Sequence, residues 1–382
     1  MKNTENVCIV TWYGSPNFGT NLQAFALSKV LRDAGYSVAM ISCLPPFSSI
    51  TSLLYYYLVN SRAYRAWLRV KGCIFKRNDR KYYLFHGNPA VEKWVRKELP
   101  CEVLKFPFEV SRLVERTDCF VVGSDQVWNT FVKFDPTMYL HFAKNKKRIS
   151  YASSLGASGI NPRYRSEVRD LLSKFMHISV RENIAVPVIR ELLGRNDVKE
   201  VIDPTLLLSD KEWEAFSVMP KVSFRKFEDY VLCYVIGDNV GYKSKVLNVW
   251  RSSGIKNLII VPACENPDFS IEGASFCMGI SPAEFVWLIR NAKLVCTDSF
   301  HATAMSLNLG IKFVELLRFD DKEEGSQNSR IYNILERYRM MSRLYKEDSA
   351  CWLEDVDYSS VHELIKRDRG DSLDWLKSSI EN

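Results

Sequence analysis

Short apolar segments alternate with helical segments along this 382-residue chain, and this alternation limits its possible folds more than any other feature. Residues 7–12 (VCIVTW) have the pattern of a buried strand, and a loop follows them. A helix is expected to start at Thr20, where Thr20 and Gln23 fit a capping box, and to stop at Gly35. A second strand at 37–41 completes a β-loop-α-β unit, which is typical of a doubly wound parallel sheet.

The same pattern continues through the first half of the chain and restarts near residue 230. The predicted strands lie at 119–122, 149–152, 177–180, 201–204, 231–236, 258–261 and 294–297. In the second half, one helix is expected from Pro282 to about Asn291 and another ends near Gly310. We therefore predict an α/β protein of two Rossmann-like domains, joined around residues 210–229 and facing a cleft.

Three domain ranges follow from this pattern and from the length of the chain. We expect an N-terminal domain at 1–212, a C-terminal domain at 225–345, and a helical tail at 346–382 that packs back on the N-terminal domain.

Composition narrows the function classes. With 47% hydrophobic and 25% charged residues, the chain has the composition of a globular protein. No apolar run approaches the roughly 18 residues of a membrane helix. The polar N-terminus lacks a secretory signal, so a cytoplasmic location is expected. The ten cysteines include no C-x-x-C pair, and Cys8, Cys119, Cys233 and Cys296 fall in apolar strands. They predict reduced core thiols, with no metal site.

The net charge of +7 is concentrated in residues 61–81, which hold eight Lys or Arg residues and one Asp. Aromatic and apolar side chains, among them Tyr64 and Trp67, alternate with these cations inside a basic-aromatic insertion at about 50–100. Such a segment fits an anionic membrane surface, with an attraction of about 1 kcal/mol per basic residue. A solvated helix with Trp67 packed inward is an equally good interpretation. Nucleic acid is disfavoured, because no nucleic-acid motif accompanies the charge.

The most informative turn is residues 296–303 (CTDSFHAT), where a strand leads into a helix. Backbone N–H groups near Ser299 lack partners at such a helix start, and this makes an anion site at the carboxyl end of a parallel strand. His301 stands in the first turn of the helix, where it can face the cleft. A structural role is the common alternative for a single histidine, but this placement favours His301 over the other four.

Three further charged residues follow strands or precede helices. Arg181 ends a predicted strand, where a guanidinium can bind phosphate or carboxylate; the alternative is a surface pair with Glu182. Arg330 lies at a predicted helix start, and Asp125 lies in a polar loop after a strand, where it could act as a general base. None of these signals is specific alone.

Taken in order, seven segments between about residues 7 and 345 resemble the polysaccharide pyruvyl transferase family. They are 13–27 (YGSPNFGTNLQAFAL), 122–129 (VGSDQVWN), 149–156 (ISYASSLG), 178–182 (ISVRE), 203–207 (DPTLL), 297–303 (TDSFHAT) and 328–331 (NSRI). Residues 45–115 and the tail after about 346 contain no matching block. The order of the seven makes the resemblance far more specific than any one of them.

The resemblance implies a GT-B-like fold and transfer of pyruvate from phosphoenolpyruvate to a sugar as a cyclic ketal. The N-terminal domain would then take the acceptor and the C-terminal domain the donor phosphate. The implied acceptor is a sugar of a cell-surface polysaccharide, such as a capsule or exopolysaccharide, or its lipid-diphosphate-linked precursor at the inner membrane face. Phosphoenolpyruvate is a co-substrate, and neither a cofactor nor a metal is expected.

Site residues are assigned on the same basis. We expect His301 and Asp125 to be catalytic, and the donor to be bound by Arg181, Ser299, His301, Arg330 and Arg318. Acceptor contacts are expected from Asn17, Asn21, Gln23, Ser124, Asp125 and Gln126. Some family members carry Arg at the position of Ser299, and Arg330, with Arg318 behind it, is the candidate replacement. Ala302 also stands where the closest subgroup has glycine.

Two other functions compete with this one. A GT-B glycosyltransferase that uses a nucleotide sugar would have the same two-domain cleft and the same helix-terminus site for a diphosphate. A glycan- or membrane-binding protein without catalysis is the third candidate. Donor identity separates the first two, and failure to bind any anionic donor would support the third.

Overall fold

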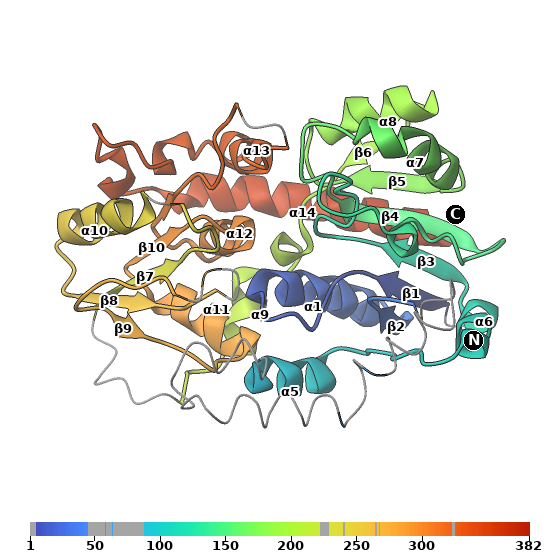
Figure 1. Ribbon diagram of the computed structural model, residues 1–382, viewed down its shortest axis with the longest axis horizontal. Coiled ribbons are helices and arrows are strands. Elements are labelled where there is room, and N and C mark those ends of the chain that lie inside the picture. The colour runs from blue at the N-terminus through green and yellow to red at the C-terminus, as the bar shows by residue number, and fades with distance from the viewer. Residues whose placement is uncertain are drawn as a thin grey trace.

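The computed structural model describes residues 5–44, 88–221, 229–239, 241–263, 268–322 and 325–382, with the single residues 58, 63 and 266. Two parallel sheets stand next to each other, each covered by helices (Figure 1). Apart from Ala63, the basic-aromatic segment at 61–81 lies outside the described residues.

The N-terminal sheet has six parallel strands in the order β2-β1-β3-β4-β5-β6. They are β1 (Asn6–Val10), β2 (Ser37–Ile41), β3 (Cys119–Val122), β4 (Lys147–Ser153), β5 (His177–Val180) and β6 (Lys199–Glu200). The C-terminal sheet has five parallel strands in the order β11-β10-β7-β8-β9. They are β7 (Tyr230–Tyr234), β8 (Asn257–Ile260), β9 (Ser275–Phe276), β10 (Leu294–Thr297) and β11 (Phe313–Glu315).

Helices connect the strands and cover both faces of the sheets. Their bounds are α1 (Phe18–Asp33), α5 (Pro89–Glu98), α6 (Pro107–Arg116), α7 (Arg165–Leu172), α8 (Ala185–Leu193), α9 (Asp210–Phe216), α10 (Tyr242–Ser253), α11 (Pro282–Asn291), α12 (Phe300–Leu309), α13 (Ser329–Arg337) and α14 (Tyr358–Glu381). Short 3-10 turns add η1 (Pro136–Tyr139), η2 (Pro162–Tyr164), η3 (Pro204–Leu206), η4 (Met341–Arg343) and η5 (Cys351–Leu353). No helix of the described part is both long and apolar enough to cross a bilayer.

The doubly wound α/β prediction is confirmed, and most predicted strands lie within two residues of the observed ones. The four strand cysteines, Cys8, Cys119, Cys233 and Cys296, are buried as expected. The predicted helix of the second half does begin at Pro282, with the capping box between Ser281 and Glu284.

Two local predictions are wrong. Helix α1 begins at Phe18 rather than Thr20, because the Asn17 side chain accepts hydrogen bonds from the N–H groups of Gly19 and Thr20. The strand predicted at 201–204 is instead the short β6, at Lys199–Glu200, followed by η3. Asp203 caps that 3-10 turn by accepting from the N–H of Thr205, so the segment leaves the sheet before its proline.

An apolar core joins the two halves. The Phe18 ring of α1 stacks on Phe285 of α11, with ring centroids 4.5 Å apart, and lies 5.8 Å from the Tyr234 ring at the end of β7. On the same side, the Asn88 amide donates to the carbonyl of Ile280. The two halves are therefore held together by packed side chains as well as by the chain that connects them.

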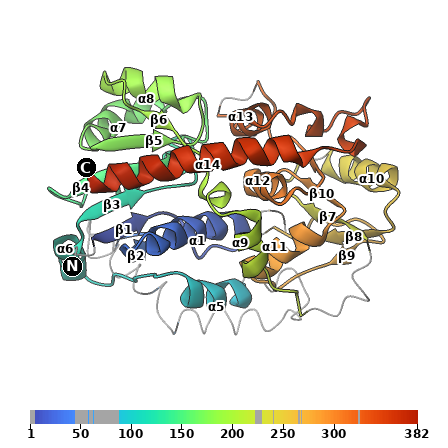
Figure 2. The same cartoon turned by 180° about the vertical axis from the view of Figure 1, so that it is seen from behind.

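The C-terminal helix α14 runs across both halves, as Figure 2 shows. Toward the N-terminal sheet, Ser372 Oγ accepts from Ile202 N–H, and the ring of Trp375 lies 6.4 Å from that of Tyr151. Toward the C-terminal half, Arg369 donates to the side chain of Asn308 in α12. This helix therefore adds a second set of contacts that hold the two halves together.

Candidate active site

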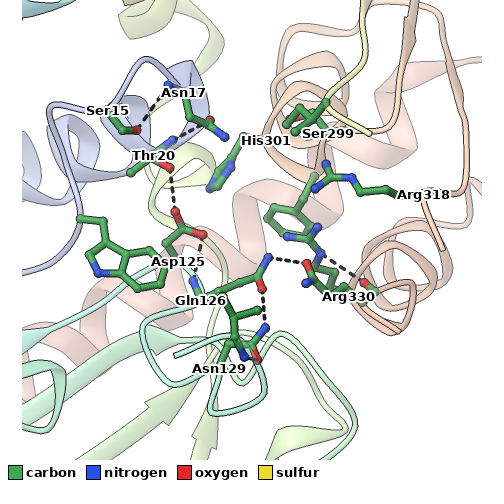
Figure 3. Close-up of a pocket in the computed structure, with 15 residues that line it drawn as sticks. Ser15, Asn17, Thr20, Asp125, Gln126, Asn129, Ser299, His301, Arg318 and Arg330 are labelled. Carbon is green, nitrogen blue, oxygen red and sulfur yellow. Dashed lines mark hydrogen bonds between the residues drawn. The ribbon is translucent and has the colours of Figure 1, made fainter. Parts of the chain in front are cut away.

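A cavity of about 360 Å³ lies between the two halves, where the carboxyl ends of strands from both sheets meet (Figure 3). The N-terminal wall of the cavity consists of Trp12, Ser15, Asn17, Thr20, Asp125, Gln126, Asn129 and Val132. The C-terminal wall consists of Ile236, Ser299, Phe300, His301, Arg318, Gln327 and Arg330. Ligands of open α/β sheets bind at this edge, because the strand-to-helix loops gather there.

Two helices begin at the cavity, one from each half. Asn17 caps α1 and Ser299 caps α12, each accepting from a backbone N–H of the first turn. Both helix N-termini therefore direct their partial positive charge toward the same space, which favours an anionic ligand.

The His301 side chain lies between the two halves. A Cβ built on Gly19 would be 2.3 Å from His301 Nδ1, so the ring rests on the first turn of α1 and only glycine leaves room for it. Its Nε2 lies 3.6 Å from Asp203 Oδ2 and is buried. The ring itself borders the cavity.

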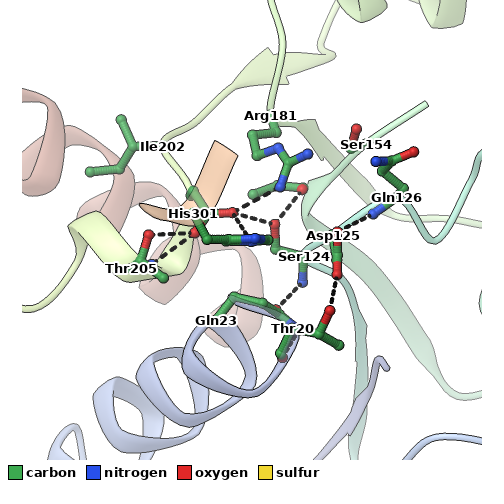
Figure 4. A network of polar contacts seen from close by, with 12 residues as sticks. Thr20, Gln23, Ser124, Asp125, Gln126, Ser154, Arg181, Ile202, Thr205 and His301 are labelled. Carbon is green, nitrogen blue, oxygen red and sulfur yellow. Dashed lines mark hydrogen bonds and ion pairs between the residues drawn. The ribbon is translucent and has the colours of Figure 1, made fainter. Parts of the chain in front are cut away.

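Asp203 is the centre of a buried polar network, and its partners His301, Arg181, Ser124 and Thr205 lie close together in Figure 4. Its Oδ2 accepts from Arg181 Nη1 at 3.0 Å and from Ser124 Oγ at 3.1 Å. Its Oδ1 accepts from the N–H and hydroxyl of Thr205 at 2.9 and 2.8 Å. Burial raises the pKa of Asp203, but the neighbouring His301 and Arg181 outweigh burial and hold that pKa well below its usual range.

Asp125 presents a carboxylate to the cavity from the loop after β3. Its Oδ2 accepts from Thr20 Oγ1 at 2.9 Å, and its Oδ1 accepts from the N–H of Gln126 at 2.9 Å. The backbone of Asp125 is left-handed, with φ of 71°, a conformation that Asp tolerates better than most residues. This turn directs the carboxylate back toward α1.

Two guanidinium groups occupy the C-terminal wall. Arg318 is tied to Asp298, donating from Nε to Oδ2 at 3.3 Å and from Nη2 to the carbonyl at 3.1 Å. Arg330 is 5% exposed, and within the described residues it forms no ion pair; its Nε donates to the carbonyl of Gln327. Burial, together with the charges of Arg318 and Arg181, lowers the pKa of Arg330 to about 9. An anion bound beside Arg330 would compensate the positive charges of Arg330 and its neighbour Arg318.

One hydrogen bond crosses the cavity. Gln126 Nε2 donates to Gln327 Oε1 at 2.9 Å, and Asn129 Nδ2 donates to Gln126 Oε1 at 2.8 Å. These amides connect the loop after β3 with the loop before α13, so they link the two walls of the cavity at this point.

The structure brings seven of the predicted site residues to the cavity: Asn17, Asp125, Gln126, Ser299, His301, Arg318 and Arg330. The other four lie behind its walls. Arg181, Asn21, Gln23 and Ser124 are all buried, and each bonds to other protein groups.

These four shape the site from behind. Asn21 donates to the carbonyls of Ser15 and Asn17, which closes the loop before α1. Gln23 accepts from Ser124 N–H at 3.2 Å and thereby joins α1 to the loop that carries Asp125. Arg181 lies 4.1 Å from the ring of Phe300, on the side of Asp203.

Sequence reasoning did not single out nine residues that the structure places at the cavity or directly behind it: Trp12, Ser15, Thr20, Asn129, Val132, Asp203, Ile236, Phe300 and Gln327. Five of them stand inside the family-like blocks, so these blocks were a usable signal: Ser15, Thr20, Asn129, Asp203 and Phe300. Gln327 lies one residue before such a block. Trp12 read as the end of a strand, and nothing in its local pattern distinguished it from a core residue.

The chain matches the model of one known protein family. The family model described as polysaccharide pyruvyl transferase matches residues 17–318. The comparison with curated proteins found no match.

Several solved structures are similar over almost their whole length. UGT89C1 of Arabidopsis thaliana, complexed with UDP-L-rhamnose, has a TM-score of 0.53 at 11% identity, over 99% of this chain and 100% of that one. UDP-N-acetylglucosamine 2-epimerase from Rickettsia bellii has a TM-score of 0.45 at 10% identity, over 98% of each chain. The glycosyltransferase SnogD from Streptomyces nogalater has a TM-score of 0.44 at 10% identity, over 97% of this chain and 95% of that one.

At these identities the similarity concerns the fold, and the predicted GT-B-like arrangement of two parallel α/β domains is confirmed. The family model covers the cavity residues from Asn17 to Arg318, including His301 and Asp125. Because this match covers well over half of the chain, the chain belongs to the polysaccharide pyruvyl transferase family.

Proposed function

We propose that this enzyme transfers pyruvate from phosphoenolpyruvate to a sugar of a cell-surface polysaccharide or of its lipid-linked precursor, forming a cyclic ketal and releasing phosphate. The observation that carries the proposal is the buried Arg330, a cation without a carboxylate partner among the described residues, which lies in the first turn of α13 and lines the same cavity wall as the N-terminus of α12. A ligand with a carboxylate and a phosphate matches two guanidinium groups and a helix start.

The donor would bind against the C-terminal wall. Arg330 is free to form charge-assisted hydrogen bonds, whereas Arg318 already donates to Asp298. Arg330 is thus the principal anion clamp, and Arg318 contributes mainly its charge. Ser299 takes part through the capped helix start rather than through a cation, since its Oγ accepts from Ala302 N–H.

His301 would start the chemistry as a general acid. It donates a proton to the C3 methylene of phosphoenolpyruvate, which leaves an oxocarbenium-like centre at C2. A first sugar hydroxyl attacks C2 and gives its proton to Asp125 on the N-terminal wall. The C2–O bond to phosphate then breaks, with the proton on Asp125 passing to the leaving phosphate. A second hydroxyl closes the ketal and returns its proton to His301, so both residues end in their starting states.

The test is a set of binding and turnover measurements on the purified protein. Calorimetric titration with phosphoenolpyruvate should give saturable binding, and UDP-sugars should give none. Phosphate release in the presence of a lipid-linked oligosaccharide fraction should be lost in His301→Ala, while this variant still binds phosphoenolpyruvate. Binding of a nucleotide sugar instead would indicate a glycosyltransferase. Near wild-type turnover by His301→Ala would refute the role of His301 as the general acid.

The acceptor side of the proposal extends to the membrane. A lipid-diphosphate-linked acceptor lies at a membrane face, and the +7 segment at 61–81 would attract the enzyme to anionic lipid. Co-sedimentation with vesicles should therefore increase with phosphatidylglycerol content and fall with salt. Binding that is equal on neutral and anionic vesicles would remove this part of the proposal and leave the donor chemistry unaffected.

A further inference from the structure

The side chain of His301 is held from two sides. On one side the ring rests on Gly19, where a Cβ would come within 2.3 Å of Nδ1. On the other side Nε2 is buried and lies 3.6 Å from Asp203 Oδ2. The ring cannot move toward α1 without displacing the first turn of that helix.

Asp203 is itself fixed by several donors. Its side chain is fully buried, and both oxygens accept hydrogen bonds, from Arg181 and Ser124 on one oxygen and from Thr205 on the other. An ionised carboxylate satisfies all of these donors at once, whereas a protonated one would place a hydrogen against one of them. Within this network, the other group next to Asp203 Oδ2 is His301 Nε2, at 3.6 Å.

From this geometry we propose that Asp203 is a positioning residue that holds the ring of His301 in place and pairs with its imidazolium form at Nε2. The inference rests on the proposed function, in which His301 is the acid and base. A buried carboxylate that orients a catalytic histidine is a general device, and it also stabilises the imidazolium form.

Arg181 has its place in the same device. It donates from Nε to Glu182 Oε1 at 2.8 Å and from Nη1 to Asp203 Oδ2 at 3.0 Å, and its plane lies 4.1 Å from the Phe300 ring. Glu182 in turn accepts from Ser154 Oγ. Arg181 therefore keeps Asp203 ionised and holds its carboxylate in place. It acts on the donor through His301 rather than by touching it.

Removal of the Asp203 charge should change how activity depends on pH. The charged groups around the ring come from several elements: Asp203, Arg181, Glu182, Asp125, Arg318 and Arg330. Among the carboxylates of the described residues, only that of Asp203 lies within 4 Å of a ring nitrogen of His301. Loss of its negative charge makes the imidazolium less stable, so the pH at which activity is half-maximal should move downward.

The decisive variant is Asp203→Asn, which keeps the shape of the side chain and removes its charge. We expect kcat for phosphate release to fall about 100-fold or more, the Kd of phosphoenolpyruvate to change less than about threefold, and the pH midpoint of kcat to fall by about one unit. The matched control is Asp368→Asn, which removes another buried carboxylate paired with an arginine, Arg337, outside the cavity. It should leave kcat and its pH midpoint unchanged.

A second variant tests the other side of the ring without touching Asp203. Gly19→Ala places a methyl group where the ring lies and should lower kcat with retained folding, while Gly159→Ala, where nothing lies within 4 Å, should have no effect. Circular dichroism and thermal unfolding of all four variants separate loss of the fold from loss of activity.

The outcomes distinguish this inference from the proposed function. If the wild-type enzyme releases no phosphate from phosphoenolpyruvate with any acceptor fraction, the proposed function fails. If the wild-type enzyme turns over and Asp203→Asn keeps its kcat and its pH midpoint, the positioning role of Asp203 is wrong and the proposed function stands. A fall in kcat with an unshifted pH midpoint, shared by Asp368→Asn, would show a merely structural role and also overturn the inference.

Discussion

The two walls of the cavity differ in charge although both are built from strand-to-helix loops. The N-terminal wall offers hydroxyl, amide and carboxylate groups, with Asp125 as its charged member. The C-terminal wall offers His301 and two arginines, of which Arg330 forms no ion pair within the described residues. Each wall includes one helix N-terminus, so the helices do not account for the difference.

The difference indicates a division of labour. A cationic wall selects an anionic donor, and a wall of hydroxyl, amide and carboxylate groups suits neutral sugar hydroxyls and can remove their protons. Substitutions on the two walls should therefore separate binding of the donor from the rate of transfer. Two experiments test this separation, and two more test how the walls are held together and what lies behind them.

Asp125→Asn should have the largest effect. Without a base for the attacking hydroxyl, kcat should fall about 10²- to 10⁴-fold, which is the usual contribution of such a group. Calorimetry should show phosphoenolpyruvate binding at least as tight as in the wild-type enzyme, because a negative charge near the anion has been removed. A weakened Kd with unchanged kcat would reverse the assignment of the two walls.

Arg330→Met should raise the Kd of phosphoenolpyruvate about 100-fold, since a buried charge-assisted contact is lost. Arg318→Met should raise it less, because Arg318 is already engaged with Asp298. Arg251→Met, an exposed arginine on α10, serves as the control for loss of one positive charge. If the Arg330 and Arg251 variants bind the donor equally well, the cationic wall is not the donor site.

The amide pair that joins the walls should have a smaller effect. A double-mutant cycle of Gln126→Ala and Gln327→Ala, measured by urea unfolding, should give a coupling free energy of about 1 kcal/mol, as expected for one neutral hydrogen bond. A coupling near zero would mean that the contact of 2.9 Å does not hold the walls together.

A buried carboxylate lies behind each wall: Asp203 behind one and Glu315 behind the other. Their influence on how stability depends on pH should be the smallest and most specific of these effects. His301 and Arg181 outweigh burial and keep the pKa of Asp203 well below its usual range, whereas burial raises the pKa of Glu315 well above its own. The Asp203 contribution to stability is therefore present above about pH 4 and is lost as the pH falls further. The Glu315 contribution is present below about pH 4 and is lost as the pH rises.

Urea unfolding at several pH values checks both signs. Asp203→Asn should flatten the acid side of the stability curve, and Glu315→Gln should flatten its neutral side. Equal curves for the wild type and both variants would mean that neither carboxylate differs in proton binding between the folded and unfolded states.

The sequence alone was sufficient for much of the fold. Runs such as 119–122 and 294–297 coincide with β3 and β10, because a strand buried on both faces leaves a continuous apolar pattern. The boundary errors at Thr20 and at 201–204 have one cause: a side chain, of Asn17 or Asp203, capped a turn that propensity did not reveal. Strands β9 and β11, of two and three residues, are too short to leave a periodic signal.

What the sequence determined by itself was the alternation of strands and helices, the ordered family-like blocks, and His301, Asp125 and Arg330 as chemical groups worth attention. Only the tertiary structure decided their roles, because these depend on contacts between residues far apart in the chain. Arg181 is not among the residues that line the cavity; it packs on the Phe300 ring and donates to Asp203, 22 residues away in sequence. His301 is seated on Gly19 from the other half of the molecule, a contact that no local pattern contains.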